Sequence, residues 1–302
     1  MPRNVWVVTA TSFLTDISSE MLVYLLPLFL ANVLGVRTAV IGLIEGIAET
    51  TASLVKVFSG WLSDRLGKRK WLTVTGYGLS TVAKPFLYLA TSWGWVLGVR
   101  FADRVGKGIR TAPRDAMVAD SIDQHHRGLA FGLHRAGDTA GAFLGLLIAL
   151  GVVWLTQGGG LSLSRETFRT LVLISIIPAV LAVLVLAVGA RDLARPAGSG
   201  ATAGKAAPPR LSLRSLSGPF RRFLVVVVFF TLGNSSDAFL VLRAQERGLS
   251  VVGVLGMLVT FNLVYAIIAA PAGALSDRID RCRLIAGGWL LYALLYNANP
   301  LS

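Results

Sequence analysis

The hydrophobic residues of this chain are gathered into long blocks separated by short polar segments. Eight blocks span 5–33, 39–60, 71–90, 94–119, 128–155, 168–189, 223–245 and 251–275, and a shorter ninth spans 284–296. A helix of about 20 residues crosses a hydrocarbon core about 30 Å thick. Because lipid offers no hydrogen-bond partner to the backbone, such continuous blocks predict membrane-spanning helices rather than barrel strands. The predicted fold class is therefore an all-α integral membrane protein.

Composition supports this prediction and excludes several other classes of protein. Of the 302 residues, 54% are hydrophobic and only 15% are charged, whereas about a quarter of the residues of a soluble domain are charged. The net charge of +13 is explained by the Lys and Arg residues that membrane proteins collect in their cytoplasmic loops. We therefore expect no nucleic-acid partner. The single cysteine, Cys282, excludes an internal disulfide. No phosphate-binding loop, catalytic constellation or metal-spaced Cys/His set occurs, which predicts no enzymatic activity, no metal and no cofactor.

A change of composition divides the chain into three parts. The segment 190–222 is rich in Ala, Pro, Gly and Ser and carries seven Arg or Lys residues, which is typical of a flexible linker. We therefore predict a six-helix bundle at 1–189, a cytoplasmic linker at 190–222 and a partial second bundle at 223–302, with helices 7, 8 and part of 9. The basic residues gather in the linker and in the loop after the second block, which places the N-terminus in the cytoplasm.

An internal repeat relates the two bundles. The string SSEMLVYL at 18–25 matches SSDAFLVL at 235–242, and GWLSDR at 60–65 matches GALSDR at 273–278. Both pairs are separated by about 215 residues. The repeating unit is therefore six helices plus the linker, and the second copy stops before its midpoint.

With these features the chain resembles the major facilitator superfamily. GWLSDRLGKRK at 60–70 is similar to the family's loop motif between helices 2 and 3, and RFADRVGKG at 100–108 is similar to its helix 4 signature. The longer string DRVGKGIRTAPRDAMVADS resembles a little-characterised bacterial and archaeal branch. The resemblance implies the major facilitator fold, a multi-pass protein of the inner membrane, and secondary transport of a small molecule by alternating access. It also implies a monomer when the protein is full length, with the lipid bilayer and coupling protons as its other partners.

Charged residues at membrane depth form the candidate transport path. Such residues cost a few kcal/mol, so they should face a partner or a watery cavity. Blocks 1, 2, 4 and 5 carry them, whereas block 6 has none and block 3 has only Lys84, which predicts an inner and an outer set of helices. The candidate substrate-path and coupling residues are Asp16, Glu20, Glu45, Glu49, Arg100, Asp103, Arg104, Lys107, Arg110, Arg114, Arg135, Asp138, Asn234 and Asp237.

The fourth block suggests the charge of the solute. Arg100, Arg104, Lys107 and Arg114 recur at helical spacing and share one face, with Arg110 at its edge. Fixed cations in a path favour an anionic or zwitterionic solute. The alternative is a buried network of ion pairs with the acids of helices 1, 2 and 5, which stabilises the bundle. Asp16 and Glu49 are the favoured proton-coupling acids by depth, because a carboxylate that loses contact with water gains proton affinity.

The loop motif predicts a separate gating site. Its residues are Gly60, Asp64, Arg65, Gly67, Lys68 and Arg69, with Gly273, Asp277 and Arg278 in the degenerate second copy. The resemblance implies that Asp64 and its basic neighbours latch the two halves in the outward-open state. A purely topological basic loop would explain the Lys and Arg residues but not the spacing of the glycine and aspartate.

Two other functions stay open. One is a multidrug efflux permease, although dense fixed charge argues against a greasy, promiscuous pocket. The other is a truncated, non-transporting receptor or scaffold, since the ninth block ends in the polar string NANPLS. We therefore expect a C-terminal truncation and a chain that is unstable or inactive on its own.

Overall fold

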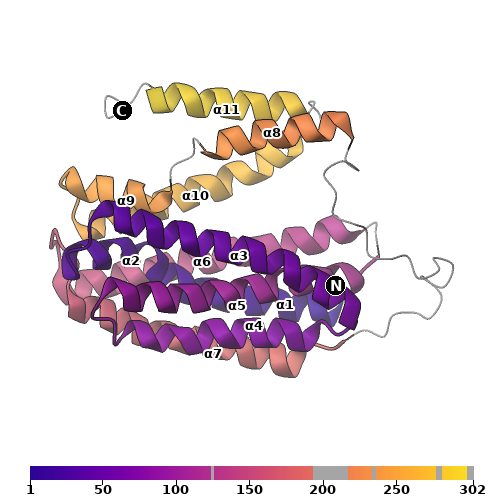
Figure 1. Cartoon of the computed structure of the whole chain (residues 1–302), viewed down its shortest axis with the longest axis horizontal. Helices are drawn as coiled ribbons and strands as arrows, with labels where there is room; N and C mark the ends of the chain where they lie inside the picture. Colours follow the sequence, from indigo (N-terminus) through magenta and orange to yellow (C-terminus); the bar gives the residue numbers. More distant parts are fainter. Residues whose placement is uncertain (124–125, 193–216, 233–235, 277–280, 298–302) are drawn as a thin grey trace. The chain divides into compact units, whose positions relative to one another are not determined.

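The computed structural model describes residues 1–123, 126–192, 217–232, 236–276 and 281–297, and every regular element in these ranges is helical (Figure 1). By contacts, the chain divides into two compact units, Met1–Leu255 and Gly256–Ser302. The elements in order are α1 (Arg3–Val23), α2 (Leu25–Leu28), η1 (Phe29–Val33), α3 (Thr38–Leu66), α4 (Lys70–Ala83), η2 (Lys84–Leu87), α5 (Trp93–Asp120), α6 (Arg127–Gln157), α7 (Arg165–Gly189), α8 (Gly218–Leu232), α9 (Asp237–Glu246), α10 (Val251–Ser276) and α11 (Arg281–Asn297).

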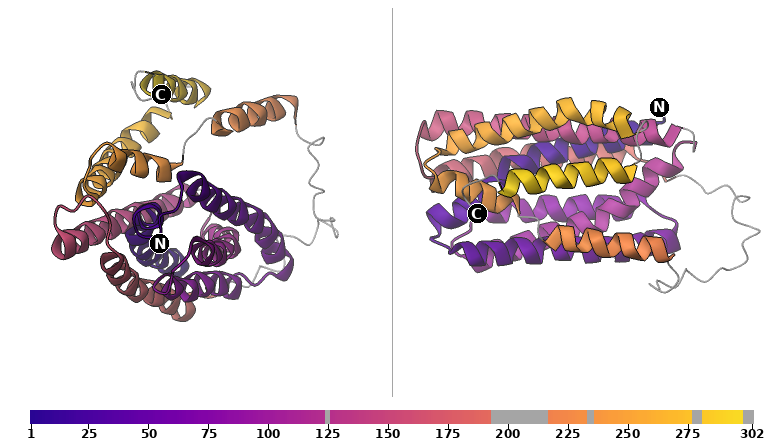
Figure 2. Two further views of the ribbon diagram at one scale, coloured as in Figure 1. Left: turned by 60° about the vertical axis from the view of Figure 1, so that its left-hand side comes forward. Right: turned by 90° about the horizontal axis from the view of Figure 1, so that it is seen from above.

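Six long helices of the first unit run side by side as one bundle (Figure 2). α1 packs along α6 and α7, α5 packs along α3 and α4, and α4 also contacts α7. The helix formed by α1, α2 and η1 is the most enclosed, since 61% of its apolar stretch is buried against 22–33% in the other candidate spans. The predicted position of the first helix on the inside is consistent with this burial.

Glycines bring α6 against the backbone of α1. A methyl group on Gly137 would lie 2.6 Å from the side chain of Thr9, and one on Gly145 would lie 2.6 Å from the carbonyl oxygen of Ile17. One on Gly141 would overlap the carbonyl oxygen of Phe13. The three contacts advance by four residues on both helices, so α1 and α6 are parallel and in fixed register.

Prolines explain where the helices depart from α geometry. Pro27 lacks an N–H and its ring crowds the carbonyl of Val23, which is where α1 ends before α2 begins. Pro85 coincides with the tighter η2 turn at the end of α4. Pro113 stays inside α5, and the carbonyl of Ile109 that it leaves unpaired accepts a 2.9 Å hydrogen bond from Ser59 Oγ on α3.

The spans agree with the predicted blocks in most places. By length and composition, five helices of the described residues can cross a membrane, namely Arg3–Val33, Thr38–Leu66, Arg127–Gln157, Arg165–Gly189 and Val251–Ile268. α5 is long enough, but its many charges lower its hydropathy. The block at 223–245 is not one helix, because α8 ends at Leu232 and Ser236 starts α9 as an extended N-cap. Serine favours such caps over helix interiors.

Candidate functional site

A charged cavity lies between α1, η2 and α5. Its volume is about 150 Å³, and its lining residues are Asp16, Ser19, Glu20, Leu22, Val23, Leu26, Lys84, Leu87, Val99, Arg100, Asp103, Arg104, Lys107 and Arg110. Asp16 is thirteen residues from the start of α1 and Lys107 is fourteen residues into α5. At 1.5 Å per residue both lie about 20 Å along their helices, so the cavity sits near the middle of the bundle.

Two of the arginines are held by acids of α3. Arg100 lies 2.5 Å from Glu45, and Arg104 lies 3.1 Å from Glu49. The side chains of Arg100 and Glu45 are only 7% and 13% exposed. These pairs match the ion-pair network that was the alternative for the basic stripe, and they join α3 to α5 through the cavity wall.

Two further cations are held by neutral partners. The ammonium of Lys84 donates hydrogen bonds to the hydroxyls of Ser18 and Ser19 on α1, the latter at 3.2 Å. The guanidinium of Arg110 donates a 2.8 Å hydrogen bond to Ser80 Oγ and lies 4.4 Å from the centre of the Tyr77 ring. Lys84 also interacts electrostatically with Asp103, and both cations line the cavity.

Four charged groups of the cavity have no such partner. Among the described residues, the side chains of Asp16, Glu20, Asp103 and Lys107 make no ion pair within 4.0 Å and no hydrogen bond. Lys107 is exposed, and the three acids are half-buried. Asp103 interacts electrostatically with Lys84 and the arginines of α5, whereas Asp16 and Glu20 both interact with Lys107. The cavity thus presents the unpaired cation of Lys107 together with the two unpaired carboxylates of α1.

The remaining predicted path residues lie away from this cavity. Arg114 is not part of the cavity lining; it is 2.9 Å from Asp115 and 3.2 Å from Ser12 Oγ on α1. Asp138 lies beside His134 on α6, and Arg135 is exposed. Asp237, in the first turn of α9, is close enough to Glu20 to interact electrostatically. Asn234 lies outside the described residues.

Sequence analysis did not assign Lys84, Ser19 or Ser80 to the path. Block 3 is nearly neutral and was placed in the outer set, yet Lys84 is only 6% exposed and reaches the cavity. The signal that could have identified it is the charge itself, because an isolated lysine in an apolar helix must find a polar partner.

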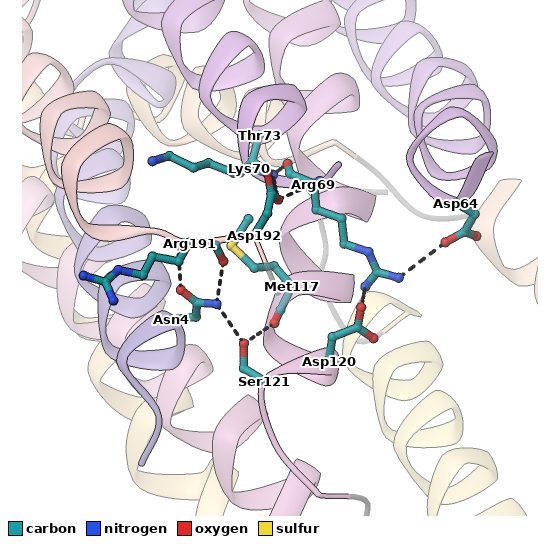
Figure 3. A network of polar contacts seen from close by, with 10 residues as sticks. All are labelled: Asn4, Asp64, Arg69, Lys70, Thr73, Met117, Asp120, Ser121, Arg191 and Asp192. Carbon is teal, nitrogen blue, oxygen red and sulfur yellow. Dashed lines mark hydrogen bonds and ion pairs between the residues drawn. The ribbon is translucent and has the colours of Figure 1, made fainter. Parts of the chain in front are cut away.

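The loop motif forms a polar cluster at the end of the bundle that holds the N-terminus (Figure 3). Gly67 ends α3 in the left-handed conformation, with φ 63° and ψ 4°, which glycine adopts at little cost. The guanidinium of Arg69 lies 2.7 Å from Asp120, at the end of α5, and 3.6 Å from Asp64, at the end of α3. Gly60 packs against α5, since a methyl group on Gly60 would lie 3.3 Å from the Cβ of Ala112.

Two more residues close this end of the bundle. The amide of Asn4 donates hydrogen bonds of 3.1 Å to Ser121 Oγ and 2.9 Å to the carbonyl of Arg191, and it accepts 3.0 Å from the N–H of Arg191. Asp192 accepts hydrogen bonds from the backbone of the first turn of α4. The second copy of the motif, with Asp277 and Arg278, lies outside the described residues, and so do the surroundings of Gly273.

Comparisons with known proteins agree on one family. The model of the Major Facilitator Superfamily matches residues 8–298. An uncharacterized MFS-type transporter of Methanocaldococcus jannaschii is 32% identical over 98% of this chain and 71% of its own length. The multidrug resistance protein MdtH of Photorhabdus laumondii is 32% identical over 41% of this chain and 30% of its own.

A solved structure gives the same fold. A bacterial homologue of the human lysosomal transporter Spinster, in an inward-facing and unoccupied conformation, matches with a TM-score of 0.67 at 18% identity. The match covers 93% of this chain and 64% of that protein. The present chain is thus shorter than both the archaeal relative and this structural neighbour.

Proposed function

Because the chain belongs to the major facilitator superfamily, we propose that it moves a small anionic or zwitterionic solute across the inner membrane by alternating access, coupled to protons. Its family match, its relatives and its apolar helices make it a multi-pass membrane protein with the major facilitator fold. Solute, coupling ion and orientation are the parts that we propose.

The pairing pattern in the cavity is the observation that carries the proposal. Arg100 and Arg104 are neutralised by acids of α3, whereas Lys107 is exposed and unpaired among the described residues. A hydrogen bond from a charged group such as the Lys107 ammonium to a bound solute contributes about 1.5–3 kcal/mol. Lys107 therefore supplies a point of attachment for a carboxylate or phosphate, and the carboxylates of Asp16 and Glu20 supply one for an ammonium group.

The same pattern selects the coupling acids. Glu45 and Glu49 have arginine partners, whereas Asp16 and Glu20 have none among the described residues. A carboxylate without a permanent cation exchanges its proton as the cavity opens and closes, because desolvation disfavours its charged form. Asp16 and Glu20 are therefore better coupling candidates than Glu49.

Charge at the ends of the bundle supports a cytoplasmic N-terminus. Arg65, Lys68, Arg69 and Lys70 lie at the same end as Asn4, and the loop there carries the gating motif. Basic residues collect on the cytoplasmic side. In this orientation, the Asp64–Arg69–Asp120 cluster joins the ends of α3 and α5 on the inside, and a latch between the two halves stays a prediction.

Multidrug efflux is the second candidate, and the match to MdtH over 41% of the chain favours it. The cavity argues in the other direction, since nine of its fourteen lining residues are ionisable or hydroxyl-bearing. Dense fixed charge in a site of about 150 Å³ suits a compact polar solute better than a large apolar one.

Flux across reconstituted liposomes tests the proposal. The chain, and a version extended to the length of the archaeal relative, are each reconstituted into liposomes. Transport of a panel of small anions, zwitterions and lipophilic cations is then measured under an imposed proton gradient. Gradient-dependent flux of a charged polar solute, lost in Lys107→Ala, supports the proposal. Flux of lipophilic cations alone supports multidrug efflux. A folded protein that moves none of the panel favours a receptor or scaffold.

A further inference from the structure

A second cluster of titratable groups lies between the cavity and the N-terminal end of the bundle. His134 is buried on α6, with its side chain only 6% exposed, and its Nε2 lies 3.8 Å from Asp138 Oδ2 one turn further along. Within the part of the chain that the structure describes, neither ring nitrogen of His134 has a hydrogen-bond partner, and neither has Asp138 Oδ1. Neither residue lines the central cavity.

The unmet hydrogen-bonding capacity of His134 and Asp138 calls for a physical reason. Buried polar groups are hydrogen-bonded with few exceptions, since an unmet donor or acceptor costs free energy. An imidazole and a carboxylate just beyond hydrogen-bond range suit a function in which a proton arrives and leaves. Both groups exchange protons readily, and histidine does so near neutral pH.

The register of α1 and α6 places this pair on the way out of the cavity. Gly137 lies against Thr9 and Gly141 against Phe13, so Asp138 is level with residue 10 of α1. Asp16 is six residues further along, or about 9 Å at 1.5 Å per residue. His134 is four residues nearer the N-terminal end, by about 6 Å.

The hydroxyl of Ser12 lies at a height between Asp16 and Asp138. Ser12 is one turn below Asp16 on the same face of α1. Its Oγ lies 3.2 Å from the hydroxyl of Tyr77 on α4 and accepts a 3.2 Å hydrogen bond from Arg114 on α5. Hydroxyls both donate and accept, so they can pass a proton between the two carboxylates.

The charged groups that face the pair come from α1, α5 and α6. Asp138 interacts with Asp16 on α1 and with Arg114 on α5. His134 faces Arg114 and Asp115 on α5, and Arg135 and Asp138 on its own helix. On α7, the charged residues Arg165, Glu166 and Arg169 lie at the opposite end of the bundle.

We propose that His134 and Asp138 form a proton-release site between the central cavity and the N-terminal end of the bundle. A proton bound at Asp16 or Glu20 passes by way of the Ser12 hydroxyl to Asp138, then to His134, and leaves to the aqueous phase at that end. One O–H bond breaks and one O–H or N–H bond forms at each step, so charge and mass balance. This inference rests on the proposed proton coupling.

Nuclear magnetic resonance of the imidazole tests the site without requiring transport. The chain has three histidines, so His125→Gln with His126→Gln leaves His134 alone to be followed in lipid nanodiscs. We expect it to pass between neutral and protonated forms as the pH is varied, at a pH that changes in Asp138→Asn. The matched control is Glu166→Gln, an 84% exposed acid of α7, which should leave the transition where it is. An imidazole of constant charge, or one unaffected by Asp138→Asn, overturns the proposal.

Flux measurements separate this inference from the proposed function. In the proteoliposome assay, His134→Gln should lower proton-driven uptake by about a hundredfold, the contribution typical of a positioned proton carrier, and should leave solute exchange at equal pH intact. Uptake that equals that of Glu166→Gln overturns the release site. If the unmodified chain carries no solute, the proposed function fails, and the imidazole titration alone decides whether the site exists.

Discussion

The carboxylate of Asp192 accepts a hydrogen bond of 2.8 Å from the backbone N–H of Lys70, and a second of 3.0 Å from that of Arg69. Asp192 follows α7, whereas Lys70 begins α4, so the two residues join elements far apart in the sequence. A carboxylate here satisfies unpaired N–H groups and complements the helix dipole. The acid thus acts as the cap that the first turn of α4 does not supply for itself.

Replacement of Asp192 by alanine should destabilise the bundle modestly. Loss of an N-cap costs about 1 kcal/mol, and asparagine caps nearly as well as aspartate. We expect Asp192→Ala to lower the free energy of unfolding in detergent micelles by about that amount, and Asp192→Asn to lower it less. Equal losses in the two variants would show that capping is not the cause.

The contact between α1 and α6 predicts a contrast between two glycines of one helix. Gly141 touches the backbone of Phe13, whereas a methyl group on Gly151 meets nothing within 4 Å. Gly141→Ala should cost about 1–3 kcal/mol through overpacking, and Gly151→Ala should gain up to about 1 kcal/mol from helix propensity. Thermal unfolding of both variants in the same detergent checks this, and a stable Gly141→Ala protein would contradict the observed close approach.

The buried pair of Arg100 and Glu45 should respond differently from an exposed pair. Removal of one partner of a buried pair costs about 3–5 kcal/mol, because the other charge is left uncompensated. The exposed pair of Arg243 and Glu246, at 2.9 Å with side chains 48% and 57% exposed, should contribute less than about 1 kcal/mol. Double-mutant cycles of equilibrium unfolding measure both pairs. Similar coupling energies would mean that water screens the cavity fully.

Lys107 should set the affinity for an anionic solute. Loss of one charge-assisted hydrogen bond of about 1.5–3 kcal/mol raises Kd about ten- to a hundredfold. We expect this increase for Lys107→Met in a direct binding measurement such as calorimetry. Arg37→Met, which removes an exposed cation at the start of α3, serves as the control. An unchanged Kd in Lys107→Met would remove the lysine from the site.

Asp16 and Glu20 should carry the coupling to protons. An amide cannot take up a proton, so Asp16→Asn and Glu20→Gln should lose uphill uptake driven by a pH gradient. Exchange of labelled for unlabelled solute at equal pH requires no net proton movement and should persist. Uptake and exchange are measured side by side in proteoliposomes. Loss of both activities would point to a structural role for these acids, and retention of both would mean that other groups carry the coupling.

Much of the architecture could be predicted from the sequence because apolar length and charge spacing are local properties. The helical class, most spans and the glycine-rich contact of the fifth block follow from 20-residue blocks and four-residue intervals. The loop motif also led to the cluster around Arg69, since its glycine and aspartate spacing is unusual for a loop that merely carries charge.

Partners across the bundle could not be predicted because they depend on how each helix is rotated about its axis. The sequence contains both acids of α3 and both arginines of α5, but not the fact that Glu45 meets Arg100 and Glu49 meets Arg104. The inward reach of Lys84 follows from the turn at Pro85. The contacts of Asn4 with Arg191 and of Asp192 with Lys70 join residues more than 120 positions apart.

The parallel contact of α1 and α6 limits how the cavity can change shape. Where main chain meets main chain at successive turns, neither helix can slide or roll without collision, because a packed interface does not deform continuously. We therefore expect α1 and α6 to move together as one rigid body. We expect Asp16 to keep its axial offset from Asp138 when the cavity changes shape, so that access to the cavity depends on elements other than this helix pair.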